Sequence, residues 1–301
     1  MDINKYGAKG RTARRQLFSL SELEEGEIYE ILWLAKKLKQ KQQVKEKLGV
    51  FDGKNVAIML KSSASRTRIS FELAVNRIGG KTLYLSPADA DFYNGLTYLD
   101  AAHILRSYGA NGLIAKNLSA EEIAELKASA LPVINLKDGR ANACQALADL
   151  FTIWETSGRL SGVKYAVFGD LRDPGAEVIN FYVKCGLEVT LCAPPELLPQ
   201  GETLRALSQF GDVALTSDVA VAMKNADAVT SIARADRAFG GFSVTPDVME
   251  LSPQAKFLHI LPVRHGEEVL DEVLYGPRSA VFARSANLIY AEQAAMMLFF
   301  R

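Results

Sequence analysis

Net charge and cysteine are what this sequence lacks most. Its 301 residues include 35 lysines and arginines and 35 aspartates and glutamates, so the formal net charge is zero. A chain without a net field is not drawn to nucleic acid or to an anionic membrane surface, and we expect a small-molecule partner instead. The three cysteines, Cys144, Cys185 and Cys192, show no CxxC spacing, which disfavours a disulfide framework and predicts reduced thiols in the cytoplasm.

Metal ligands and long apolar runs are also scarce. The three histidines, His103, His259 and His265, lie far from any pair of cysteines, so we expect no zinc and no other metal. No segment approaches the roughly 20 apolar residues of a membrane span, and the first residues lack the apolar stretch of a signal peptide. These features predict a cytoplasmic protein with no membrane partner.

The first 15 residues are basic. They carry Lys5, Lys9, Arg11, Arg14 and Arg15 against a single acidic side chain. A solvated mobile tail is the favoured interpretation. A transit peptide and an arm that contacts another subunit are the alternatives.

The hydrophobic pattern predicts two α/β domains. Apolar residues at helical spacing indicate a first helix from Ser21, with Ser21 and Glu24 as a possible capping box, and a Lys/Gln-rich connector at 39–47. Short apolar runs then alternate with helical segments, which is typical of βαβ units and a parallel sheet. The expected strands are 56–60, 82–85, 112–115, 133–135, 164–168, 187–192, 213–215, 228–231 and 257–260.

A long helix at 143–154 separates two series of such units. We therefore predict two doubly wound parallel-sheet domains joined by long helices. The first spans residues 1–149 with a C-terminal helix at 287–301, whose apolar stretch begins at Leu288, and the second spans residues 150–286.

Residues 60–72, LKSSASRTRISFE, are the most informative segment. They predict a strand end that turns into a helix. Hydroxyl side chains and backbone N–H groups at a helix N-terminus form an anion site, and a guanidinium beside them can bind two phosphate oxygens at once. A serine-rich loop that caps a surface helix, with solvated arginines, is the alternative interpretation.

This segment resembles the S-T-R-T-R-x-S-F-E signature of the aspartate and ornithine carbamoyltransferases. Residues 142–150, NACQALADL, are similar to the H-P-C-Q-A-L-A-D-L of the ornithine enzymes. Residues 259–262, HILP, stand where those enzymes have H-C-L-P, and residues 282–290 resemble their F-x-Q-A-E-N segment. The resemblance covers nearly all of the chain after residue 17.

The resemblance implies a carbamoyltransferase-like fold and the transfer of a carbamoyl group from carbamoyl phosphate, or a similar donor, to the amine of an amino acid. It implies no metal or organic cofactor, and a homotrimer or a multiple of trimers whose sites lie between subunits and between domains. The catalytic residues that it indicates are Arg66, Asn142, Gln145 and His259. The substrate-binding residues that it indicates are Ser65, Arg66, Thr67, Lys116, Asn142, Gln145, Arg172, Arg234, Leu261 and Pro262.

Several family side chains are replaced. Ala64 stands for the signature serine and Asn94 for the basic residue that reaches a neighbouring subunit's site. Lys116 stands for an arginine and loses its bidentate fork, and Leu288 stands for another arginine. Asn142 replaces the catalytic histidine, although an amide can still donate a hydrogen bond to a carbonyl oxygen.

The acceptor side departs as well. Residues 231–237, SIARADR, lack the D-x-x-x-S-M-G pattern for ornithine and place Ile232 where aspartate enzymes have an arginine. Ile260 replaces the cysteine of H-C-L-P. We therefore expect an acceptor other than ornithine or aspartate. Side chains that could form a different pocket, for an acidic ligand, are Arg172, Arg234, Arg237, Arg264 and His265; exposed loop arginines are the alternative.

Two other functions stay open at this point. The first is a catalytically inactive family member that acts as an anion-binding, regulatory or assembly subunit, because the substitutions fall on donors of the site. The second is nucleotide binding by the loop 169–175, which follows a strand but lacks G-x-G-x-x-G.

Overall fold

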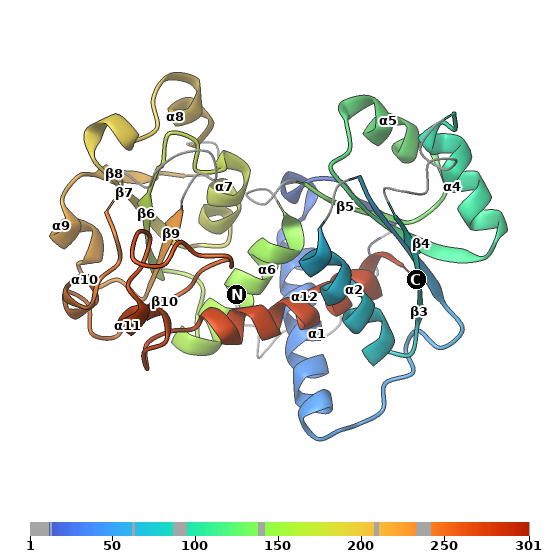
Figure 1. The fold of residues 1–301 in the computed structure, drawn as a ribbon, viewed down its shortest axis with the longest axis horizontal. Coiled ribbons are helices and arrows are strands. Elements are labelled where there is room, and N and C mark those ends of the chain that lie inside the picture. The colour runs from blue at the N-terminus through green and yellow to red at the C-terminus, as the bar shows by residue number, and fades with distance from the viewer. Residues whose placement is uncertain are drawn as a thin grey trace. The chain divides into compact units, whose positions relative to one another are not determined.

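The structure is a computed structural model that describes residues 12, 14–61, 64–86, 95–137, 142–207, 211–232 and 242–300. The chain divides into two compact units (Figure 1): residues 1–147 with 288–301 form the first unit, and residues 148–287 form the second. Each unit contains one five-stranded sheet whose strand pairs are all parallel. The predicted α/β class with two parallel sheets is confirmed.

The sheet of the first unit has the order β1-β5-β4-β2-β3. Its central strands are continuous apolar runs, as expected for strands covered on both faces. The strands are β1 (Gln16–Leu17), β2 (Asn55–Leu60), β3 (Lys81–Leu85), β4 (Ala110–Lys116) and β5 (Val133–Leu136).

Helices cover both faces of this sheet. On one face, Ala102 and Leu105 of α4 (Tyr98–Ser107) and Leu126 of α5 (Ala120–Ala128) pack on the strands. The other face carries α1 (Glu25–Gln43), α2 (Ser65–Arg77) and the C-terminal part of α12 (Val281–Phe299). Gln293 of α12 ties this layer together: its amide nitrogen donates to the Ala74 carbonyl at 3.0 Å, and its amide oxygen accepts from Gln42 at 2.9 Å.

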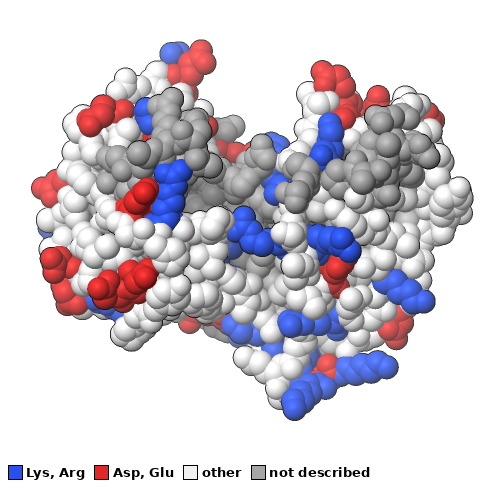
Figure 2. All heavy atoms as spheres, in the orientation of Figure 1, with Lys and Arg blue, Asp and Glu red and all other residues white. Residues whose placement is uncertain are grey.

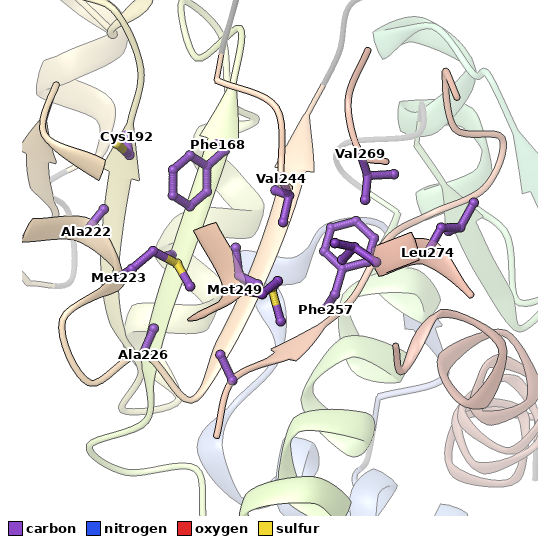
Figure 3. Close-up of a cluster of buried hydrophobic side chains, with 14 of the residues drawn as sticks. Phe168, Cys192, Ala222, Met223, Ala226, Val244, Met249, Phe257, Val269 and Leu274 are labelled. Carbon is purple, nitrogen blue, oxygen red and sulfur yellow. The ribbon is translucent and has the colours of Figure 1, made fainter. Parts of the chain in front are cut away.

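The sheet of the second unit has the order β10-β9-β6-β7-β8. Its strands are β6 (Lys164–Gly169), β7 (Glu188–Cys192), β8 (Ala214–Thr216), β9 (Ala228–Ile232) and β10 (Lys256–Phe257). A buried apolar cluster fills one face, and Figure 3 shows Phe168, Val244, Met249 and Phe257 within it. The described helices of this unit are α6 (Ala143–Ser157, which begins in the first unit), α7 (Ala176–Lys184), α8 (Gly201–Leu207), α9 (Val219–Met223), α10 (Pro246–Glu250), α11 (Asp271–Leu274) and the start of α12. A 3-10 turn lies at Pro195–Leu197 in this unit, and another lies at Leu20–Glu22 in the first unit.

A buried polar network lies where α6, α7 and α12 meet in the second unit. Asp149 accepts hydrogen bonds from Arg284 Nε at 2.6 Å and from the Tyr182 hydroxyl at 2.6 Å. Burial and the neighbouring Asp149 charge raise the pKa of Tyr182, so its hydroxyl stays protonated and donates. Asp149 and Arg284 have almost no exposed side-chain surface, so each depends on the other for compensation of its charge.

Several predicted boundaries are wrong. Ser21 lies in a 3-10 turn, and the capping box belongs to Glu24 and Glu27, because the first helix begins at residue 25. That helix continues to Gln43 through half of the predicted connector, since lysine and glutamine are good helix formers. β10 is shorter than predicted, because the chain leaves the sheet after Phe257.

The last helix begins at Val281, before its long apolar run, because Arg284 and Asn287 find buried partners. The basic N-terminal segment is also not wholly a tail: β1 pairs with β5, and Arg14 pairs with Glu27 at 3.3 Å. Lys5, Lys9 and Arg11 lie outside the described residues.

Charges of both signs are spread over the face shown in Figure 2, as the balanced composition suggests. Among the described residues, no helix has both the length and the apolar character needed to cross a membrane. All three cysteines are buried as free thiols. Burial raises the pKa of Cys144 well above its usual value, and the nearby Glu292 raises it further, so this thiol is not a ready nucleophile.

Candidate functional site

The predicted site residues of the first unit gather at the carboxyl edge of its sheet. Leu60 of β2 is the register partner of Lys116 of β4, and Lys116 is the partner of Leu136 of β5. Each strand therefore ends at the same edge. α2 begins at Ser65, shortly after β2, and Asn142 precedes α6, shortly after β5. Ligands of open α/β sheets bind outside this edge.

The N-terminus of α2 has backbone and side-chain features that are typical of an anion site. Its N-cap position is held by Ala64, which makes no side-chain capping bond, and the Arg68 N–H donates to the Ala64 carbonyl at 3.0 Å. The N–H groups of the first turn of an α-helix have no acceptor within the helix, and the helix dipole favours negative charge there. Ser65 and Arg66 are exposed in this turn, and Thr67 is half-buried.

Arg66 and Arg68, the two arginines near the start of α2, have different surroundings. Arg68 pairs with Glu72 at 2.8 Å, and its guanidinium lies 4.0 Å from the centre of the Tyr84 ring on β3. Glu72 raises the pKa of Arg68, so the two charges are matched to each other. Arg66 lies two residues closer to the helix N-terminus and is exposed in the first turn. Arg66 is therefore the guanidinium of this helix that best suits a phosphate, and Arg68 belongs to the structure.

Hydrogen bonds to α12 hold the second and third turns of α2 in place. The Ser70 hydroxyl contacts Glu292 of α12 at 2.8 Å and the Thr67 carbonyl at 3.0 Å, and both side chains are buried. Because α12 holds α2 through Ser70 and through the Ala74 carbonyl, the first turn has a fixed place at the sheet edge. Sequence reasoning did not single out Glu292, since nothing near it in the chain marks it as a partner of α2.

Asn142 caps α6. Its side-chain oxygen accepts the Gln145 N–H at 3.2 Å, and its side chain is buried. Because the oxygen is used in this way, the NH2 group of the amide is the part that can serve a ligand, and it can only donate. A donor is what a carbonyl oxygen needs. Gln145 is half-buried on the first turn of the same helix.

Replacement cations are only partly available. Lys61, which follows β2, holds both carboxylate oxygens of Glu122 at 2.8 and 3.0 Å, so its charge is already matched. Lys116 is half-buried at the end of β4. Leu288 is half-buried on α12. Asn94 lies outside the described residues, so the structure does not place it.

In the second unit, β6 ends in a tight backbone contact. Gly169 has φ 116°, and a Cβ atom there would lie 2.1 Å from the Ile232 carbonyl oxygen of β9. The next residue, Asp170, donates its N–H to that same oxygen at 3.0 Å. Its buried carboxylate pairs with the Arg172 guanidinium, with Nε at 2.8 Å from Oδ1 and a second contact from Nη2 to Oδ2. The charge of Arg172 is therefore matched within the loop.

Two of the other basic side chains proposed for an acidic ligand, Arg264 and His265, also face carboxylates. Arg264 lies 3.6 Å from Glu267, and His265 Nδ1 lies 2.6 Å from Asp271. Arg234 and Arg237 lie outside the described residues. The described part of the chain therefore does not assemble a cluster of unmatched cations for an acidic ligand.

His259 is buried after β10 and oriented by a carboxylate. Its Nε2 lies 2.7 Å from Glu268 Oε2, and the second oxygen of Glu268 accepts the Arg264 N–H at 3.0 Å. Ile260, the next residue, is exposed, and the Leu261–Pro262 peptide bond that follows it is cis. Sequence reasoning missed Glu268, which lies nine residues beyond its partner in a Glu-Glu pair with no local signal.

The described residues contain no group of three or more histidines, cysteines, aspartates or glutamates placed to hold a metal ion. The arrangement is instead one of cationic and neutral donors at the first sheet edge, with a carboxylate-bound histidine at the second. Such donors bind a phosphate and polarise a carbonyl.

Comparison with known proteins agrees with this geometry. Residues 15–155 match the model described as the carbamoyl-P binding domain of aspartate/ornithine carbamoyltransferase, and residues 161–299 match its Asp/Orn binding domain. An ornithine carbamoyltransferase from Methanosarcina mazei is 32% identical, covering 96% of this chain and 100% of that protein. One from Bacillus subtilis is also 32% identical, covering 94% of this chain and 92% of its own length.

Solved structures show the same likeness. Ornithine carbamoyltransferase from Pyrococcus furiosus superposes with a TM-score of 0.85 at 30% identity, covering 96% of this chain and 98% of that one. The enzyme from Thermus thermophilus gives 0.83 at 28% identity, covering 96% and 100%. With both units matched and relatives aligned over nearly their whole length, the chain belongs to the aspartate/ornithine carbamoyltransferase family.

Proposed function

We propose that this protein transfers a carbamoyl group from carbamoyl phosphate to the amine of an amino acid or a related acceptor. The first unit would bind carbamoyl phosphate and the second the acceptor. The observation that carries the proposal is the first turn of α2, where Ser65, Arg66 and Thr67 stand at a helix N-terminus without a side-chain cap. The match of that unit to a carbamoyl-P binding domain supports it.

The remaining donors suit the carbonyl of the same ligand. Asn142 offers an NH2 group just before α6, Gln145 lies on the first turn of that helix, and Lys116 adds a positive charge at the end of β4. Donors aimed at a carbonyl oxygen stabilise the negative charge that develops there during attack by an amine. An amide and an ammonium replace a histidine and an arginine, so we expect slow turnover.

Arg66 and Arg68, near the start of α2, provide the test. Arg66→Met should weaken binding of carbamoyl phosphate roughly 10- to 100-fold, because a charge-assisted hydrogen bond to phosphate is lost. Arg68→Met should leave that affinity nearly unchanged, since Arg68 is matched by Glu72 and Tyr84. The measurements are calorimetric titration with carbamoyl phosphate and transfer of label from carbamoyl-labelled carbamoyl phosphate into acid-stable products of an amine pool.

Equal weakening in both variants would contradict the assignment of Arg66. Binding that depends on Arg66 without any labelled product, from folded protein beside a working control enzyme, would instead support the inactive, anion-binding alternative. A labelled product identifies the acceptor directly. The comparison with named ornithine carbamoyltransferases makes ornithine an obligatory member of the pool.

We further propose that this protein binds its acceptor through contacts that differ from those by which related enzymes bind ornithine or aspartate. The support is the aliphatic character of two positions at the second sheet edge, Ile232 at the end of β9 and Ile260 after His259. The predicted pocket for an acidic ligand has weaker support, because Arg172 is already matched by Asp170. An acceptor with an aliphatic chain and an amine fits these residues better.

A homotrimer, or a multiple of trimers, is also proposed. Ile69 and Leu73 are exposed one turn apart on α2, which packs against the edge strand β3, and Leu83 on that strand is exposed too. Exposed apolar residues beside a strand edge are suited to contact a second copy of the chain.

Light scattering should therefore report a particle of three chains or a multiple of three. Ile69→Asp should reduce the particle to single chains, because a charge cannot be desolvated in an apolar contact. Leu251→Asp, at an exposed position of the second unit, is the matched control and should leave the mass unchanged. A wild-type protein that is monomeric at micromolar concentration would refute the assembly.

A further inference from the structure

The end of α1 carries positive charge that the proposed function does not use. Residues 36–47 include six lysines and one glutamate. Part of that charge is matched locally, because Lys41 pairs with Glu46. In Figure 2, Lys and Arg side chains gather at the bottom of the view, where Figure 1 places the end of α1. Exposed lysines and exposed valines lie together there, and we call this set the basic surface: Lys45, Lys47, Val44 and Val50.

Lys45 stands at a position that usually takes glycine. Its N–H donates to the Gln42 carbonyl, and the Glu46 N–H donates to the Lys41 carbonyl, both at 3.0 Å. These two bonds are the Schellman ending of a helix, in which the residue after the C-cap is left-handed. The φ of Lys45 is 57°, a conformation that glycine adopts with less strain. Local rules are most often broken at functional positions, so the strained lysine indicates that its side chain is used.

An aromatic row is exposed on the second unit, around α11. The Tyr275 ring stacks on His265 with centroids 6.3 Å apart and on Phe282 with centroids 6.0 Å apart. The angles between the ring planes are 23° and 19°, so the three rings are nearly parallel. Tyr275 and Phe282 remain 62% and 54% exposed. A stacked row of rings in contact with solvent is a candidate contact surface.

Carboxylates flank the row of rings. Asp271 accepts a hydrogen bond from His265 Nδ1 at 2.6 Å. Among the described residues Glu272 has no ion-pair partner, and it is exposed on α11. In Figure 2, Asp and Glu side chains gather at the lower left, where Figure 1 places α10 and α11. We call this set the acidic surface: Glu267, Asp271, Glu272, Tyr275 and Phe282.

The two surfaces complement each other in charge and in apolar character. Lysine ammonium groups pair with carboxylates, and they also bind over the faces of aromatic rings. The exposed valines of the basic surface suit the exposed rings of the acidic surface. The formal net charge of the chain is zero, so copies attract each other only where opposite charges are unevenly distributed. A protein that presents both surfaces can therefore bind a second copy of itself.

We propose that the basic surface of one copy binds the acidic surface of a second copy, head to tail. Because the two surfaces differ, the contact is heterologous, and a copy that binds through one surface can bind a further copy through the other. The contact is separate from the apolar contact proposed for the trimer and does not depend on carbamoyl transfer. An anionic lipid or a nucleic acid would occupy the basic surface alone and leave the acidic surface without a role.

Sedimentation of the full chain at low and at high salt tests the contact. Screening shortens the reach of charges from about 10 Å at 0.1 M salt to about 3 Å at 1 M salt. At about 0.05 M salt the wild-type protein should therefore form particles of at least about twice the mass found at about 0.5 M. The apolar trimer contact resists salt, so the mass at high salt reports that contact by itself.

Charge reversal tests each surface. Lys45→Glu with Lys47→Glu, and separately Glu267→Lys with Glu272→Lys, should each weaken the salt-sensitive association at least about tenfold, because like charges then meet. A variant with all four substitutions restores both opposite charges and zero net charge, so it should recover most of the association. Misfolded protein could not show this recovery.

The matched control is Arg106→Glu with Lys127→Glu. Both residues are exposed, on α4 and α5, which cover the opposite face of the first sheet from α1. This variant changes the net charge as much as Lys45→Glu with Lys47→Glu does, yet it should associate as the wild type does. Lys45→Gly should weaken the association without lowering the melting temperature, because glycine relieves the left-handed φ.

Three results would overturn the proposal. The first is a wild-type mass that does not change with salt. The second is association that survives charge reversal of either surface, since a head-to-tail contact needs both. The third is a variant with all four substitutions that is folded by circular dichroism but does not associate. Failure of carbamoyl transfer leaves each of these measurements unaffected, so the two proposals are tested separately.

Discussion

Replacing Arg284 with methionine should destabilise the second unit by about 3–5 kcal/mol. The guanidinium is buried and bonded to the Asp149 carboxylate at 2.6 Å, so its removal leaves a buried negative charge with only the Tyr182 hydroxyl. The free energy of unfolding can be measured in urea by tryptophan fluorescence. A Trp33→Phe background makes Trp154 of α6 the single reporter, and Trp154 lies in the second unit.

The matched control is Arg159→Met. Arg159 pairs with Asp227 at 2.8 Å, but half of its side chain is exposed, so we expect a loss of at most about 1 kcal/mol. Adding Asp149→Asn to Arg284→Met removes the stranded charge and should recover part of the stability. Equal losses for the buried and the exposed arginine would mean that burial of the pair does not govern its contribution.

Replacing Gly169 with alanine should cost more than about 4 kcal/mol or prevent folding of the second unit. The new Cβ would lie 2.1 Å from the Ile232 carbonyl oxygen, and that oxygen already accepts the Asp170 N–H. Because the atom that the Cβ meets belongs to the backbone of the neighbouring strand β9, no side-chain rotation can relieve the clash. β6 and β9 must separate, which also displaces Asp170 and Ser231 at the candidate acceptor site.

Gly158→Ala separates this clash from the cost of the backbone conformation. Gly158 also has a positive φ, 75°, but no atom lies within 4 Å of its added Cβ. Its replacement should cost about 1–2 kcal/mol, the usual penalty of a left-handed residue. Circular dichroism and the yield of soluble protein report folding if urea titration is not possible. A stability of Gly169→Ala similar to that of Gly158→Ala would show that the two strands separate easily.

The first-unit site was largely predictable from the sequence. Ser65, Arg66 and Thr67 follow a buried strand and open a helix, and that local order alone places them at a sheet edge. The same order predicted Asn142 at the start of a helix, although its capping bond to Gln145 required coordinates. The different surroundings of Arg66 and Arg68 could not be read from the motif, because Tyr84 lies sixteen residues away on another element.

The second-unit site was predicted less well. His259 was singled out by resemblance, yet its partner Glu268, nine residues further along the chain, becomes visible only in the folded structure. For Arg172, a predicted substrate-binding residue, the sequence did not predict the pairing with Asp170, two residues away in the loop after β6. Side-chain pairing of this kind depends on backbone direction, which periodicity does not report.

What the sequence by itself determined is the series of strands and helices, the two parallel sheets and the place of Ser65, Arg66 and Thr67 in the first turn of α2. Those features depend on local spacing: apolar runs of strand length, helical periodicity, and hydroxyl and arginine residues at a helix start. The tertiary structure decided which charges are matched. Asp149 with Arg284, Ser70 with Glu292, and His259 with Glu268 are each brought together by packing of separate segments, and the energy of a charge depends on those neighbours.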